Sequence, residues 1–282
     1  MENSLPINGS CGGCRDGKLA IPITMAFQPV VDITERRIDA YEALVRGPKG
    51  EAALHVLSQI TSENRYAFDQ ACRVKAIEMA SALGIECGLN INFLPNAVYE
   101  PRACIAKTLA TAARTGFPLN RLTFEIVEQE DLADIDHLQR IVHEYRQIGF
   151  KIAMDDFGSG FSSLARFADL KPDTVKLDRA VVQNCDTDET RRAIIVHTVR
   201  LCRELNVKLV VEGVETEAEV VALQMAGARF MQGYYFARPA FEAAVSVETI
   251  NWSRSAVTGR PARAGRSAAS RRAKPCVAAC EL

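Results

Sequence analysis

The strongest constraint on the fold is a regular alternation of short β-like runs and helical runs between about residues 25 and 235. The candidate strands cover 25–32, 37–46, 88–93, 121–128, 151–156, 174–178, 208–213 and 229–235. Apolar residues recur at helical spacing over about 64–84, 101–114, 134–148, 187–205 and 216–226. Strands that alternate with helices form parallel βαβ units, and about eight of them predict an α/β fold of the TIM (β/α)8 barrel type. An open doubly wound sheet is the alternative, but no G-x-G-x-x-G follows a strand.

Polar side chains recur on one side of six of these strands. Parallel strands covered on both faces should be apolar almost throughout. In 121–128, for example, Phe124 and Ile126 share one parity and would face the helices, while Glu125 has the other and would face inward. The inward polar residues are Glu42, Asn90, Asn92, Glu125, Asp155, Lys176 and Glu212. They would meet at the C-terminal mouth of a barrel, where TIM barrels hold their active sites.

An excess of carboxylates in that mouth predicts bound metal. The carboxylates expected there are Glu42, Glu125, Asp155, Asp156 and Glu212, and the cations are Lys176 and Arg46. Burying carboxylates without cations to neutralise them is energetically costly. An ordinary ion pair at the end of one strand would not explain why six strands place a polar residue with the same parity near the same end. Oxygen donors suit Mg²⁺, Mn²⁺ or Ca²⁺ better than Zn²⁺. Two such ions about 4 Å apart commonly cleave phosphodiesters, and Asp155 is the best candidate to bridge them.

Asp155 and Asp156 raise a geometric question, because neighbours on a strand point to opposite faces. Asp155 has the inward parity, whereas Asp156 has the outward one. We expect Asp156 to reach the same site because the pleat ends there. The following residues 157–160, Phe-Gly-Ser-Gly, would supply the break, since glycine adopts backbone angles that other residues avoid.

Composition adds limits outside this central region. The 282 residues carry a formal net charge of -1, which gives no reason to expect DNA or RNA as a partner. We see neither a secretory signal nor an apolar run long enough for a membrane span, so we expect a cytoplasmic protein. Residues 1–20 are interpreted as a flexible arm with a C-x2-C pair at Cys11 and Cys14, residues 21–245 as the folded domain, and residues 246–282 as a basic, disordered tail.

Eight motifs in order resemble the EAL-domain cyclic di-GMP phosphodiesterases, over roughly residues 21–245. The motifs are FQPVVD (27–32), YEALVRG (41–47), LNINFLP (89–95), FEIVEQE (124–130), MDDFGSGFSSL (154–164), PDTVKLD (172–178), VVEGVET (210–216) and MQGYYFARP (231–239). The resemblance implies a modified TIM barrel with one antiparallel strand. It also implies two Mg²⁺ or Mn²⁺ ions and hydrolysis of cyclic di-GMP to linear pGpG, by a protein expected to be a homodimer.

The same resemblance implies roles for individual residues. The implied metal ligands are Glu42, Asn92, Glu125, Asp155 and Asp156, with Asp155 bridging. The implied catalytic group comprises Glu42, Asp155, Lys176 for the attacking water, Glu212 near the metals as general base, and Gln232 beside the water. The implied substrate contacts are Gln28, Leu44, Arg46 and Asp178, with Arg46 on a phosphate, and Glu128 would steady the loop after Asp156.

Two positions depart from the family pattern without removing a ligand. Leu94 replaces a small hydroxyl residue, and Val127 replaces a threonine. An alternative function therefore stays open at this point. A catalytically weak or inactive EAL domain would act as a cyclic di-GMP receptor or a protein-interaction module.

Overall fold

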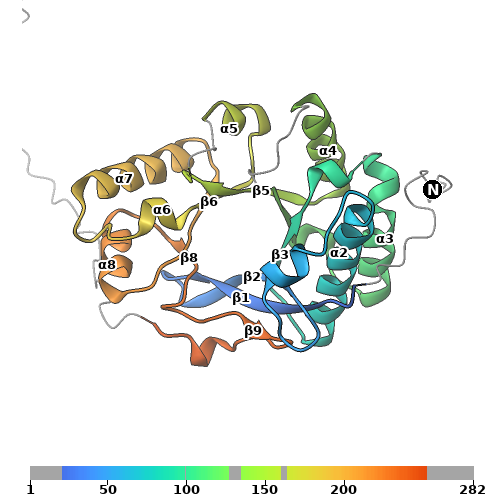
Figure 1. Cartoon of the computed structure of the whole chain (residues 1–282). Helices are drawn as coiled ribbons and strands as arrows, with labels where there is room; N and C mark the ends of the chain where they lie inside the picture. Colours follow the sequence, from blue (N-terminus) through green and yellow to red (C-terminus); the bar gives the residue numbers. More distant parts are fainter. Residues whose placement is uncertain (1–20, 99, 127–134, 160–163, 253–282) are drawn as a thin grey trace, which may run out of the picture.

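The computed structural model describes residues 21–98, 100–126, 135–159 and 164–252, and these form a closed barrel (Figure 1). The strands are β1 (Thr24–Asp32), β2 (Arg37–Arg46), β3 (Gly88–Phe93), β4 (Leu122–Ile126), β5 (Lys151–Phe157), β6 (Thr174–Leu177), β7 (Lys208–Val211), β8 (Phe230–Met231) and β9 (Ala240–Phe241). β2 to β8 follow one another around the barrel, and β1 closes it between β8 and β2. β1 is antiparallel to both neighbours, while β2 to β8 are parallel. The expected modified TIM barrel is therefore confirmed.

Helices surround most of this barrel in Figure 1, with β9 beside β1 at the bottom of the view. The α-helices are α1 (Ala53–Leu57), α2 (Arg65–Ala82), α3 (Pro101–Thr115), α4 (Ile135–Ile148), α5 (Leu164–Leu170), α6 (Arg179–Val182), α7 (Glu189–Glu204) and α8 (Glu217–Met225). Short 3-10 turns are η2 (Pro95–Ala97), η3 (Leu119–Arg121) and η4 (Val247–Thr249). The five expected helices lie within two residues of α2, α3, α4, α7 and α8. The sequence did not predict α1, α5, α6 or β9.

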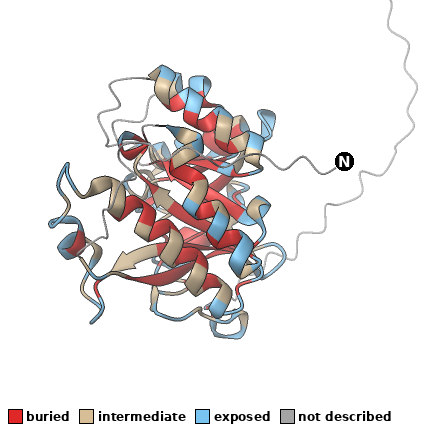
Figure 2. Ribbon diagram, turned by 90° about the vertical axis from the view of Figure 1, so that its right-hand side faces the viewer, coloured by how far each residue is buried: buried red, intermediate tan, exposed pale blue. Residues whose placement is uncertain are grey.

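The core lies between the outward strand faces and the helices. Figure 2 shows buried residues on the strands and on the inner helix faces, and exposed residues on the outer helix faces. Around α4, for example, Tyr145 packs against Phe93, Phe124 and Phe150, with ring centroids 5.2 to 5.8 Å from its own. The bulky parity predicted from the sequence therefore forms the helix-facing layer, which leaves the other parity for the barrel interior.

The folded part extends a little past the boundary expected at residue 245. η4 follows it, and Ile250 is buried against a core cluster that Trp252 also contacts. The division into domains at 20 and 245 otherwise stays a prediction. Among the described helices, none is long and apolar enough to cross a membrane.

Candidate metal centre

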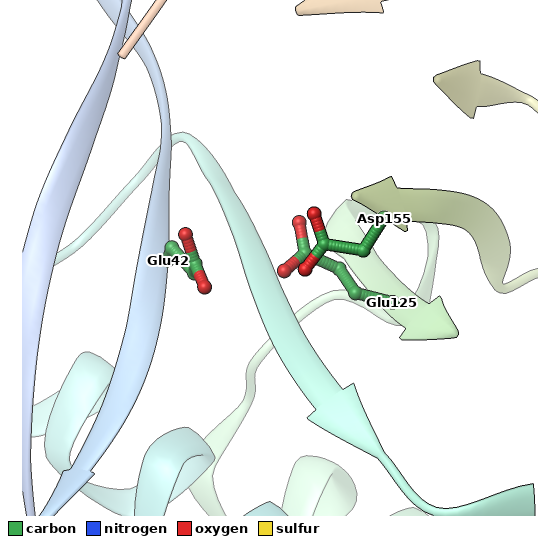
Figure 3. A group of neighbouring side chains, drawn as sticks. All are labelled: Glu42, Glu125 and Asp155. Atoms are coloured by element: carbon green, nitrogen blue, oxygen red, sulfur yellow. The ribbon is translucent and has the colours of Figure 1, made fainter. Parts of the chain in front are cut away.

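Three carboxylates from three strands converge inside the barrel. Glu42 on β2, Glu125 on β4 and Asp155 on β5 each offer an oxygen within 4.8 Å of the others (Figure 3). Glu42 approaches from the side opposite the other two in that view. The inward parity of the strands brings them together, since Glu125 also lies opposite Asn92 in the register of β3 and β4. All three are buried, so their charges face the interior rather than solvent.

A second group shares one member with the first. Asp155, Asp156 and Glu212 also offer oxygens within 4.8 Å of one another. Asp155 therefore belongs to both groups, as a bridging ligand would. Glu212 follows the end of β7, and its backbone nitrogen donates to the carbonyl of Leu177, which fixes it beside β6 (2.9 Å).

Asp156 reaches this group through a bulge in β5. Met154 pairs with Val175 and Phe157 with Leu177, so β5 uses one more residue than β6 over the same span. Asp156 has a φ of 55°, in the left-handed region that non-glycine residues seldom adopt. The pleat is interrupted at Asp156, as expected, but the expectation that residues 157–160 supply the break is wrong, because the bulge lies at Asp156 itself and β5 continues to Phe157. The geometric result, both aspartates in one site, is as expected.

Lys176 on β6 lies in the middle of both groups. Its Nζ is 3.3 Å from Glu42, 3.0 Å from Glu125, 3.1 Å from Asp155 and 2.8 Å from Glu212. Its side chain is 1% exposed. A single buried ammonium thus contacts four carboxylates.

Side-chain amides hold the carboxylates from the neighbouring strands. Asn92 donates to Glu42 (3.0 Å), and Gln232 donates to Glu42 (2.7 Å) and to Gln28 (3.2 Å). Asn90 donates to Glu125 (2.9 Å). The sequence signal for this contact is the inward parity that Asn90 shares with Asn92, although parity alone predicts no role for Asn90. The amides orient the carboxylates, much as outer hydrogen bonds orient metal ligands.

The crowding of charges changes the proton affinities. Burial raises the pKa of Glu125 and Glu212 well above the usual range, and Lys176 offsets only part of that effect. Burial, with the nearby Asp155, raises the pKa of Asp156 to about 6. Burial alone would lower the pKa of Lys176, but the surrounding carboxylates raise it well above its ordinary value. Glu125, Glu212 and Asp156 therefore take up protons more readily than ordinary carboxyl groups, because one ammonium does not offset the burial of so many carboxylates.

These residues fit a pair of hard divalent cations. The donors are carboxylate oxygens with an amide at hand, and Mg²⁺, Mn²⁺ and Ca²⁺ prefer such donors. Gln232 carries a buried Oε1 that has no hydrogen-bond partner within the described structure, so the site has unused acceptor capacity. Among the described residues, Glu42, Glu125 and Asp155 form one group that could hold an ion, and Asp155, Asp156 and Glu212 form another.

A cavity of about 290 Å³ opens beside the carboxylates. Its lining includes the expected site residues Gln28, Glu42, Asp178, Glu212 and Gln232. It also includes Arg179, Glu215 and Tyr234, for which the sequence predicted no role. Gly233 is required here by close approach, since a Cβ would lie 2.0 Å from the Val214 carbonyl oxygen. The cavity gives a ligand access to the centre.

The remaining expected substrate residues lie near the same mouth with less direct contacts. Asp178 caps α6 by accepting from the Ala180 backbone (2.7 Å). Leu44 and Arg46 follow Glu42 along β2, and the Arg46 guanidinium donates to the Val45 carbonyl (2.7 Å). Within the described residues, no ion pair joins Arg46 to the carboxylates. Glu128 lies outside the described residues.

The fold and the site define a class of protein. It is a mixed, TIM-like barrel with a cluster of carboxylates suited to metal binding at the C-terminal ends of its parallel strands. A family model described as the EAL domain matches residues 20–239. The chain therefore belongs to the EAL domain family, whose members include cyclic di-GMP phosphodiesterases. The resemblance seen in the motifs is confirmed.

Three relatives illustrate the match. A standalone versatile EAL protein from Vibrio cholerae O395, solved in a c-di-GMP-bound form, is 46% identical, with a TM-score of 0.78 over 81% of this chain and 96% of that chain. BlrP1 from Klebsiella pneumoniae, solved as a manganese/cyclic di-GMP complex, is 31% identical, with a TM-score of 0.75 over 79% of this chain and 57% of that chain. The cyclic di-GMP phosphodiesterase RocR from Pseudomonas aeruginosa is 37% identical over 56% of this chain and 40% of RocR. The chain spans about half the length or less of the curated relatives it matches.

Proposed function

We propose that this chain is a phosphodiesterase that uses two Mg²⁺ or Mn²⁺ ions to hydrolyse cyclic di-GMP to linear pGpG, and so lowers the level of this messenger in bacterial signalling. The observation that carries the proposal is the sharing of Asp155 between the two carboxylate groups. The c-di-GMP in the Vibrio cholerae relative and the manganese in the BlrP1 complex support the choice of substrate and metal. A homodimer stays a prediction.

When bound, the metal ions would supply electrophilic stabilisation of a phosphoryl group and a water that loses its proton near neutral pH. Glu42, Asn92, Glu125, Asp155 and Asp156 would hold the ions. Lys176 stays protonated and, as a compact cation, orients the attacking oxygen. Glu212 has its Oε1 2.8 Å from the lysine and accepts the water's proton.

The residues around the mouth then position the phosphodiester. Arg46 would neutralise charge on a phosphoryl oxygen of the substrate. Gln232 accepts a hydrogen bond at its unpaired Oε1 while its amide nitrogen keeps Glu42 in place. Gln28 and Asp178, which line the cavity, contact the nucleotide together with Leu44, and Glu128 steadies the loop that follows Asp156.

The test is hydrolysis by the purified full chain. With cyclic di-GMP and Mn²⁺ or Mg²⁺, chromatography should show pGpG, and EDTA should stop its formation. Asp155→Asn should lower turnover by about 100-fold or more, since even groups that only orient metal ligands cost 10–100-fold. Asp136→Asn is the matched control, because Asp136 is an exposed residue on α4.

Folded, metal-loaded protein that binds cyclic di-GMP but forms no pGpG would contradict the proposal. That result would support the receptor alternative instead.

A further inference from the structure

A second cavity lies beside the barrel at the end opposite the metal centre. It has a volume of about 510 Å³ and lies among the β1–β2 turn, the C-terminal end of α7, and α8. Because β1 runs antiparallel to β2, this turn lies where the parallel strands begin. We call it the arginine cavity, after Arg36, Arg203 and Arg229 in its lining. None of the residues that line it is acidic.

Two of the three arginines, Arg36 and Arg203, have no carboxylate partner among the described residues. Arg229 pairs with the buried Asp32 (2.7 Å) and lies 3.8 Å from Glu35. Within the described residues, no ion pair is present for Arg36 or Arg203. Two uncompensated guanidinium groups at one cavity suit a dianion, and a phosphate monoester carries about -1.5 to -2 at pH 7. Guanidinium groups bind phosphate through paired, charge-assisted hydrogen bonds.

The other walls suit a largely apolar group that carries an N–H donor. Val220 and Phe236 are buried apolar residues of the lining, and Trp252 lies beside them with the Arg36 guanidinium 5.4 Å from its ring centroid. Gln224 also lines the cavity, and its Oε1 is buried without a hydrogen-bond partner within the described structure. A buried, unpaired acceptor is unfavourable until a donor reaches it. An exocyclic amino group of a nucleobase is such a donor.

The chain's own C-terminal segment is a poor occupant. Residues 253–282 follow Trp252 directly and carry seven Arg or Lys residues against one Glu. Like charge therefore opposes their entry among three arginines. A separate anionic ligand is favoured.

We propose that the arginine cavity binds a nucleoside monophosphate, with the phosphate at Arg36 and Arg203 and the base at Gln224 and the apolar wall. This site is separate from the metal centre and does not depend on the proposed hydrolysis. It would let a nucleotide bind to the chain while the metal centre is free.

AMP, adenosine and inorganic phosphate are the probes. Each is titrated into the full chain in EDTA, with isothermal calorimetry for affinity and Trp252 fluorescence for location, because Trp252 is the chain's single tryptophan. AMP should bind saturably and change the fluorescence. Adenosine and phosphate should each bind at least about tenfold more weakly, since each lacks one half of the contacts.

Variants assign the binding to residues. Arg203→Gln should weaken AMP at least about tenfold, the loss expected for a hydrogen bond to a charged group. Gln224→Leu should weaken AMP but not phosphate. Arg200→Gln is the matched control on the same helix, where Arg200 pairs with Glu204 (2.9 Å) outside the lining; it should bind AMP like the parent.

Three results would overturn the proposal. The first is the absence of saturable AMP binding. The second is an equal loss of AMP affinity in Arg203→Gln and Arg200→Gln, which would mean that surface charge alone attracts AMP. The third is phosphate binding as tightly as AMP, which would leave the base without a role.

Discussion

Lys176 supplies positive charge that stabilises the metal-free centre. Its ammonium contacts four buried carboxylates, so it offsets much of the repulsion among them. Removing one partner of a buried ion pair usually costs about 3–5 kcal/mol. Lys176→Met should therefore lower the free energy of unfolding by about that amount in EDTA, measured with urea.

Metal should reduce this loss, because divalent cations replace the missing charge. The same titration with saturating Mn²⁺ should show a smaller difference between variant and parent. Lys151→Met is the control, since Lys151 is exposed at the start of β5. An equal loss with and without Mn²⁺ would contradict this account.

Asp156 should make the metal-free protein less stable as the pH rises. Its pKa is about 6 in the folded chain against 3.8 for an ordinary aspartate. A raised pKa means that the folded state holds the proton more tightly, so this stability is fully present below pH 3.8 and is lost as the pH rises through 6. In EDTA, Asp156→Asn should be more stable than the parent at pH 7.5 and nearly equal to it at pH 4. Urea titrations that give the same difference at both pH values would rule this out.

At the scale of elements, a buried ion pair ties α2 to the end of β3. Asp69 pairs with Arg73, accepts from the Leu94 backbone nitrogen (3.0 Å), and is 2% exposed. Arg73 also donates to the Tyr145 hydroxyl on α4 (3.2 Å). This network fixes the segment just after Asn92, so it supports the metal centre from the helix layer.

Asp69→Ala should lower the free energy of unfolding by about 3–5 kcal/mol, because it leaves the Arg73 charge buried and unpaired. Tyr145→Phe is the comparison and should cost only about 1 kcal/mol, the value of one hydrogen bond. Chemical denaturation measures both. Similar losses in the two variants would show that Arg73 finds another partner.

The sequence predicted the helices, strands and site residues that follow a periodic pattern. It did not predict features that arise from a single contact between distant parts of the chain. The inward row from Glu42 to Glu212 follows strand parity, so it needed no coordinates. The bulge at Asp156 depends on the pairing of β5 with β6, which the sequence of β5 does not contain. α6 and β9 are too short to show a period, since β9 is two residues paired with β1. The contact of Lys176 with four carboxylates likewise requires side-chain positions from five strands or strand ends.

For the whole molecule, metal should act as a stabilising ligand. A ligand that binds only the folded state adds about 2.7 kcal/mol at 100 times its Kd. For a domain of this size that corresponds to roughly 5–10 °C in Tm. Differential scanning fluorimetry with Mn²⁺ should show this rise, and Asp155→Asn should show little of it. If neither Mn²⁺ nor Mg²⁺ raises the Tm of the parent protein, the result would contradict a metal centre.

The antiparallel strand β1 also determines when the barrel can close. Val31 pairs with Met231 and Phe27 with Ala240, so β1 completes its pairing only when β8 and β9 are present. Contacts so distant along the chain slow folding, because the loop must close before they form. Until β8 is made, β1 to β7 can therefore pair only as an open sheet, with unpaired edges at β1 and β7. The assembly of this enzyme-like barrel is thus exposed to edge-to-edge association for most of its translation.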